Sequence, residues 1–63
     1  MLKELDSVRL KMPLPEGVVP VGSKGVVLFV YTEPTLGYEV EFFDSANKSF
    51  GTFTTDEVHL ESV

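Results

Sequence analysis

The residues of this chain whose types and spacing could do chemistry include its single histidine and two flanking carboxylates. Glu57, His59 and Glu61 alternate along the sequence, so on a strand all three side chains would share one face. Carboxylate and imidazole groups at this spacing can hold a divalent metal ion. The sequence offers no second cluster to complete the ligand shell, which favours a solvated polar face. No metal site is therefore expected.

Glu39 and Glu41 form a second pair of carboxylates that would share one face of a strand. Two carboxylates can serve as acid and base when an apolar pocket keeps one of them protonated. No nucleophile accompanies this pair, because the chain has no cysteine and its serines lie in no recognisable nucleophile elbow. The chain is expected not to be an enzyme, with no catalytic residue and no cofactor.

Length and charge restrict the classes of protein further. The chain has 63 residues, five Lys and Arg against ten Asp and Glu, and a net charge of −5. This length allows one domain, residues 1–63. Residues 1–6 lack the apolar core of a signal peptide, and the longest apolar run, 26–31, is too short to span a bilayer. A cytoplasmic protein without membrane contact is expected.

The elements that must position these side chains are predicted to be short strands. The expected strands, with one helical turn at 55–57, are 5–12, 26–31, 38–42, 49–54 and 58–61. A helix competes for the beginning of the chain, because Leu2, Leu5 and Val8 are also helically spaced. Five short strands separated by turn residues indicate a small barrel or sandwich.

The loop between the first two expected strands, residues 13–22, contains three prolines and two glycines, which exclude regular structure. The same loop carries four apolar side chains, Leu14, Val18, Val19 and Val21. We expect it to fold back and close one mouth of the barrel.

The hairpin formed by residues 26–31 and 38–42 contains a conflict of register. Strict pairing of Tyr31 with Tyr38 would place Leu28 and Val30 on the solvent side. Either a β-bulge changes the register midway, or an apolar patch is exposed. A long strand bent around a barrel corner buries both faces in turn, which favours burial.

Several segments, taken in order, resemble the DUF4926 family of short bacterial proteins. The segments that carry the resemblance are 2–8 (LKELDSV), 14–16 (LPE), 22–27 (GSKGVV), 30–31 (VY) and 38–42 (YEVEF). The resemblance covers nearly the whole chain and implies an SH3-like barrel. The Gly-x-x-Gly-x-Val pattern of residues 22–27, which leads into the second expected strand, is similar to KOW-type domains. It implies no catalytic or binding residues. Family members more often have a polar residue, such as His, at the position of Phe29.

These observations together predict an all-β, five-stranded SH3-like barrel with a Pro/Gly-rich apolar first loop and a short helical turn before the last strand. The chain has more aromatic residues than so small a core needs, and SH3-like barrels commonly bind peptides through exposed aromatics. The predicted protein-contact patch comprises Leu28, Phe29, Val30, Tyr31, Glu39 and Glu41. The expected function is that of an acidic adaptor or an antitoxin-like or immunity-like partner of another, basic protein.

Two alternatives remain open. Arg9, Lys11 and Lys24 could gather beside Phe29 or Tyr31 and form a KOW-like surface for nucleic acid. The net charge opposes this function, because phosphate neutralisation supplies most of such affinity. Alternatively, the apolar patch could be the contact between copies of the chain in a homo-oligomer. The positions of the three cations relative to the glutamates discriminate between protein and nucleic acid.

Overall fold

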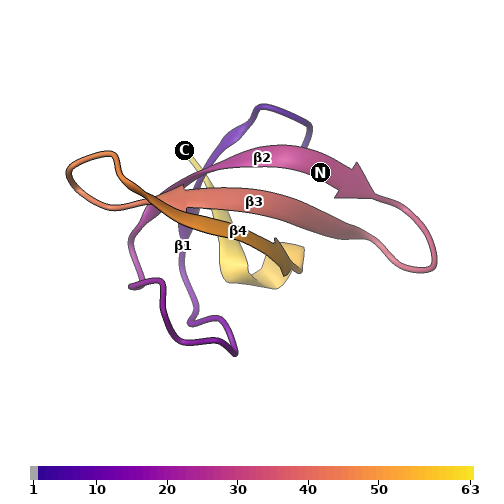
Figure 1. Ribbon diagram of the computed structural model, residues 1–63. Helices are drawn as coiled ribbons and strands as arrows, with labels where there is room; N and C mark the ends of the chain where they lie inside the picture. The colour runs from indigo at the N-terminus through magenta and orange to yellow at the C-terminus, as the bar shows by residue number, and fades with distance from the viewer. Residues whose placement is uncertain (1) are drawn as a thin grey trace.

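The computed structural model describes residues 2–63, which form five antiparallel strands in one sheet (Figure 1). The strands are β1 (Ser7–Leu10), β2 (Lys24–Tyr31), β3 (Gly37–Phe43), β4 (Ser49–Thr55) and β5 (Leu60–Ser62). A single 3-10 turn, η1 (Glu57–His59), precedes β5. The predicted all-β class, the five strands and the helical turn are confirmed. Within residues 2–63, no helix has the length and apolarity to cross a membrane.

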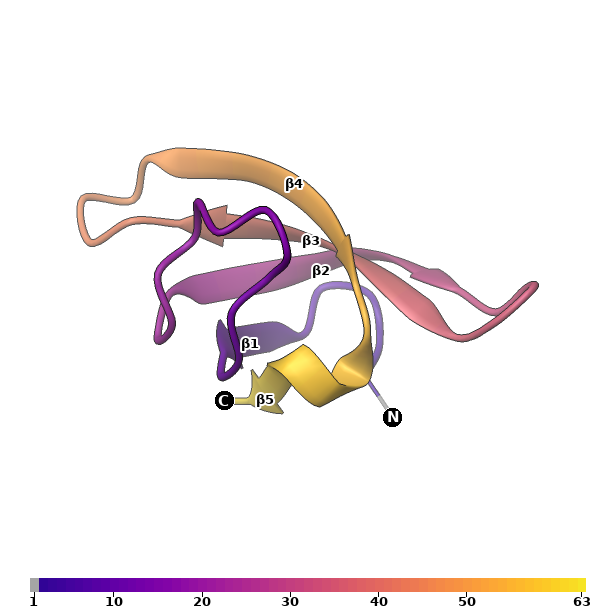
Figure 2. The same cartoon turned by 90° about the horizontal axis from the view of Figure 1, so that it is seen from below.

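The order of the strands in the sheet is β4-β3-β2-β1-β5, so the last strand returns to pair with the first. Leu10 of β1 lies opposite Leu60 of β5. Figure 2 shows how the sheet curls, with β4 on one side of the molecule and β1 and β5 on the other. Because β4 and β5 are the two edges of this curled sheet, the sheet is open between them.

The core lies inside this curl, and β3 contributes most to it. Tyr38, Val40 and Phe42 are fully buried, whereas the residues between them are only partly covered. This alternation is the one predicted from the sequence. The buried apolar side chains are Leu2, Val8, Leu10, Leu14, Val19, Val27, Tyr38, Val40, Phe42 and Leu60.

The loop between β1 and β2 contributes two side chains to the core, as predicted for an apolar loop that folds back. Leu14 and Val19 are buried, whereas Val18 and Val21 are exposed. Figure 2 shows this loop rising from the β1 side of the molecule toward β4. It therefore covers part of the opening that the sheet leaves between its edges.

The first strand is shorter than predicted, and the competing helix is absent from residues 2–8. Residues 4–5 form a turn in which Leu5 has a φ of 71°. The Leu5 amide nonetheless donates to the carbonyl of Val27 at 2.6 Å, and the Val27 amide donates to the carbonyl of Asp6 at 3.0 Å. The turn is thus tied to β2 by the backbone, although it interrupts the strand pattern.

Candidate functional site

A β-bulge at Leu28 resolves the conflict of register in the hairpin formed by β2 and β3. Val27 lies opposite Val40, but the next pair is Phe29 with Glu39, which leaves Leu28 without a partner. A bulge was one of the two possibilities that the sequence allowed, and it is confirmed. Pairing beyond the bulge is shifted by one residue from the strict register considered above.

The shift determines which side chains of β2 face solvent. Tyr31 lies opposite Gly37, not Tyr38, and Val30 lies opposite Tyr38 and packs against the core. Tyr31 does not pair with Tyr38, because the hairpin closes at Tyr31 and Gly37, on the turn side of the bulge. Val30 therefore lies on the inner side, away from the other members of the predicted patch.

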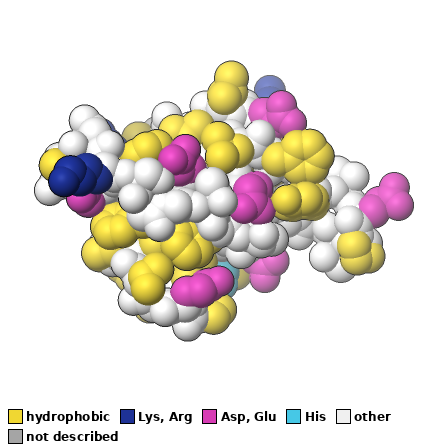
Figure 3. Space-filling model, in the orientation of Figure 1, with side chains coloured by type: hydrophobic (Ala, Val, Ile, Leu, Met, Phe, Trp, Pro, Cys, Tyr) yellow, Lys and Arg dark blue, Asp and Glu magenta, His cyan; other side chains and the backbone are white. Residues whose placement is uncertain are grey.

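The remaining apolar members of the patch are exposed. Of the two aliphatic side chains whose burial was favoured, Val30 is half-buried against the core, but Leu28 is exposed, so that expectation was wrong for Leu28. The exposed fractions are 42% for Leu28, 49% for Phe29 and 38% for Tyr31. With Glu39 and Glu41, they form what we call the outer face: Leu28, Phe29, Tyr31, Glu39 and Glu41. Figure 3 shows hydrophobic and acidic side chains side by side over β2 and β3.

Glu39 organises the centre of the outer face through hydrogen bonds. The Tyr31 hydroxyl donates to Glu39 Oε1 at 3.2 Å, and Thr54 Oγ1 donates to the same oxygen at 2.7 Å. The Phe29 and Tyr31 rings meet edge to face, with centroids 4.9 Å apart. Three strands thus hold two aromatic rings and one carboxylate in a defined arrangement.

Hydrogen bonding to Glu39 is the main reason that the pKa of Tyr31 is raised above its ordinary value of 10.0; desolvation and the negative charge of Glu39 act in the same direction. Burial is the largest reason that the pKa of Tyr38 is also raised, and its bond to Glu57 adds to this effect. Both phenols therefore stay protonated at neutral pH, and the Tyr31 hydroxyl remains a donor to Glu39.

Both tyrosines are expected to ionise above pH 10.0 in the folded protein, measured by the absorbance of tyrosinate. Each pKa is higher in the folded than in the unfolded chain. The free energy of unfolding is therefore at its full value, as far as these two tyrosines are concerned, below pH 10.0, and it declines as the pH rises above that value. In Glu39→Gln the midpoint of Tyr31 is expected to fall, with Tyr31→Phe identifying its signal. Ionisation of Tyr31 at or below pH 10.0 in the unsubstituted protein would contradict the proposed bond to Glu39.

The three cations considered for nucleic-acid binding do not lie beside the aromatic rings. Arg9 and Lys24 are opposite each other on β1 and β2, but Arg9 is also opposite Glu61 of β5. Lys24 begins β2, whereas Phe29 lies in its second half, roughly 15 Å away at the rise of a strand. Lys11 follows the end of β1. A stacking platform and a basic patch are therefore not combined on one surface.

The structure contradicts the shared strand face expected for Glu57, His59 and Glu61. Glu57 and His59 lie in η1, and only Glu61 lies on β5. The Glu57 carboxylate accepts a hydrogen bond from the Tyr38 hydroxyl at 3.1 Å, so it fixes the turn to the core. Within residues 2–63, no group of three His, Cys, Asp or Glu side chains is arranged to hold a metal ion.

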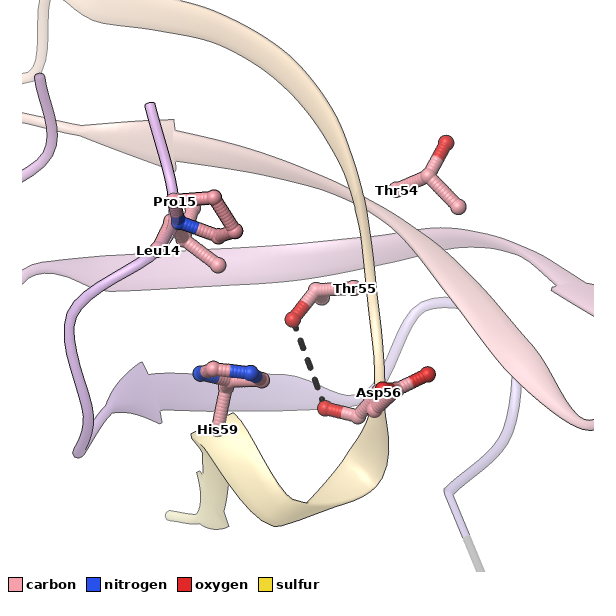
Figure 4. A pocket seen from close by; sticks show the side chains of 6 residues that line it. All are labelled: Leu14, Pro15, Thr54, Thr55, Asp56 and His59. Atoms are coloured by element: carbon pink, nitrogen blue, oxygen red, sulfur yellow. Dashed lines mark hydrogen bonds between the residues drawn. The ribbon is translucent and has the colours of Figure 1, made fainter. Parts of the chain in front are cut away.

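Two hollows flank the end of β4, and the sequence did not predict either. The first, of about 120 Å³, is lined by Leu14, Pro15, Thr54, Thr55, Asp56 and His59 (Figure 4). His59 Nδ1 is buried and has no hydrogen-bond partner among residues 2–63.

The second hollow, of about 240 Å³, lies at the end of the β2–β3 hairpin. Its lining includes Tyr31, Glu33, Pro34, Leu36, Thr54 and Asp56. We call it the hairpin hollow. The sequence signals this hollow only through the turn with Glu33 and Pro34, shortly after Tyr31. The lining residues at the end of β4 are far away in the chain, so local spacing does not place them there.

Comparison with known proteins places the chain in a family. The model of a family described as a domain of unknown function, DUF4926, matches residues 4–61. No curated protein and no solved structure matches the chain. The matched residues include the whole outer face and the hairpin hollow.

Proposed function

The chain belongs to the DUF4926 family, a domain of unknown function, and from this premise we propose that it is a non-catalytic module that binds another protein. The binding surface is the outer face. The observation that carries this proposal is the exposure of two aromatic rings, Phe29 at 49% and Tyr31 at 38%, around a hydrogen-bonded Glu39.

Large aromatic side chains contribute most to binding energy at protein interfaces. On the outer face, the Tyr31 ring is held by its bond to Glu39 and by its edge-to-face contact with Phe29. A surface that is ordered before binding loses less conformational entropy when a partner arrives. The arrangement thus favours recognition of a partner by rigid aromatic anchors.

The charge of the chain supports a basic partner. The net charge is −5, and Glu39 and Glu41 lie within the proposed binding surface. In a two-fold contact between copies, the same acidic surface would face itself, which disfavours a homo-oligomer through this face. An adaptor or an antitoxin-like or immunity-like partner of a basic protein is the form of the proposal that these charges favour.

Capture of partners from a lysate of source cells, with and without nuclease, tests the proposal. Phe29→Ser is expected to weaken capture of a protein partner by about 30-fold, the effect of losing an interface anchor of about 2 kcal/mol. Val18→Ser is the matched control, because Val18 is an exposed apolar side chain outside the outer face. Its capture of the partner is expected to be unchanged.

Equal capture by the unsubstituted protein, Phe29→Ser and Val18→Ser would contradict binding through the outer face. Recovery of nucleic acid alone, or of proteins lost on nuclease treatment, would support the KOW-like alternative. Circular dichroism of Phe29→Ser should match that of the unsubstituted protein, because an exposed ring contributes little to the core.

A further inference from the structure

The hairpin hollow is continuous with the outer face. Tyr31 belongs to both, and Thr54, which lines the hollow, donates to Glu39 at the centre of the outer face. A segment of a partner that lies across the outer face therefore reaches the hollow at its end. The hollow, of about 240 Å³, has room for one long side chain.

The hollow has a negatively charged lining with an unusual feature at Asp56. Glu33 and Asp56 contribute carboxylates and are both exposed. Asp56 occupies the N-cap position of η1, where an aspartate usually accepts a hydrogen bond from the first turn, but it makes no such bond. Figure 4 shows its side chain pointing away from His59. Because it caps no amide of η1, this carboxylate can accept a donor from a partner.

The other walls of the hollow suit the rest of a long cationic side chain. Pro34 and Leu36 line it with apolar surface, and Leu36 is 40% exposed. Lysine and arginine bury their aliphatic stems on such surface while the charged end reaches polar groups. The Tyr31 ring, fixed by its hydroxyl bond to Glu39, adds an aromatic wall to the hollow, and aromatic rings attract such cations.

We propose that the hairpin hollow holds a lysine or arginine side chain of the protein bound by the outer face. This inference rests on the proposed function for the identity of the partner, and it specifies the partner's chemistry. The cation lies between Glu33 and Asp56, with its stem along Pro34 and Leu36. The bound segment thus carries a basic residue at the position that meets the end of the β2–β3 hairpin.

The recognition of the cation can be tested without the partner by following amide signals of the protein in NMR spectra. The probes are Nα-acetyl-arginine amide, Nα-acetyl-lysine amide and, as a neutral isostere, Nα-acetyl-citrulline amide. A cationic probe is expected to shift the signals of Tyr31, Gly37 and Asp56, whereas the citrulline probe is not. Equal shifts with citrulline, or none with either cation, would overturn the inference.

A charge-matched pair of variants locates the site. Glu33→Gln with Asp56→Asn is expected to weaken binding of the cationic probe at least fivefold. Glu4→Gln with Glu16→Gln removes the same charge from exposed positions outside the hollow, and its binding should change less than twofold. Equal weakening in both would show only a general effect of net charge and would contradict the inference.

The captured partner separates this inference from the proposed function. If Phe29→Ser loses the partner and Glu33→Gln with Asp56→Asn retains it fully, the outer face binds and the proposed cation subsite is wrong. If both variants lose it, both proposals gain support. If Phe29→Ser retains the partner, the proposed function fails, and the probe titration still decides whether the hollow binds a cation.

Discussion

Replacement of Phe42 by alanine is expected to remove a large part of the free energy of unfolding of this protein. Phe42 is fully buried near the end of β3 and is among the largest fully buried side chains of residues 2–63. Removing such a ring costs about 3–5 kcal/mol, whereas a chain of this size has a free energy of unfolding of roughly 3–9 kcal/mol. Urea denaturation followed by circular dichroism measures the loss.

Phe29→Ala is the matched control for Phe42→Ala, because it removes the same ring from an exposed position on the neighbouring strand. Its free energy of unfolding is expected to stay within about 0.5 kcal/mol of the original. Similar losses for the two variants would contradict the division of the hairpin into a core side and an outer face.

Gly25→Ala is expected to destabilise the fold by about 1–3 kcal/mol, the usual cost of overfilling a packed core. A Cβ at position 25 would lie 2.9 Å from Phe42 Cδ1 and 2.9 Å from Val40 Cγ1, closer than carbon atoms approach without displacement. Gly37→Ala is the control, since its Cβ would meet only the Thr55 carbonyl oxygen, at 3.8 Å. Urea denaturation of both variants should show a loss at Gly25 alone.

The same contact predicts that substitutions at Gly25 and Phe42 are coupled. A smaller side chain in Phe42→Leu leaves room for the methyl group of Gly25→Ala, so the double variant should be more stable than the sum of the single effects predicts. Strict additivity would mean that the backbone of β2 moves to relieve the contact, instead of the ring.

The part of the fold that could be predicted from the sequence is the part with a clear period. In β3, buried Tyr38, Val40 and Phe42 alternate with charged residues, and this period of two defines both the strand and its inner face. The run in residues 26–31 is apolar throughout, so its pattern does not show which residue a bulge leaves unpaired. Pairing with β3 in three dimensions determines that Leu28 is the extra residue.

The end of the chain shows a second limit. Residues 57–61 alternate as a strand does, yet residues 57–59 form the turn η1. Their conformation is constrained by a long-range contact, since the buried Tyr38 hydroxyl donates to Glu57. The hairpin hollow also depends on residues that are far apart in the chain, because Tyr31 and Leu36 line it together with Asp56. Local spacing carries no information on such contacts.

The unpaired Leu28 also divides the sequence of β2 into two stretches that can diverge at different rates. Before it, Gly25 and Val27 are constrained by the packed core, and few substitutions there leave the fold intact. After it, Phe29 and Tyr31 project into solvent, so their replacement changes surface chemistry with little effect on folding. Drift at these two positions of one strand can thus change the chemistry of the surface while the sheet itself is inherited unchanged.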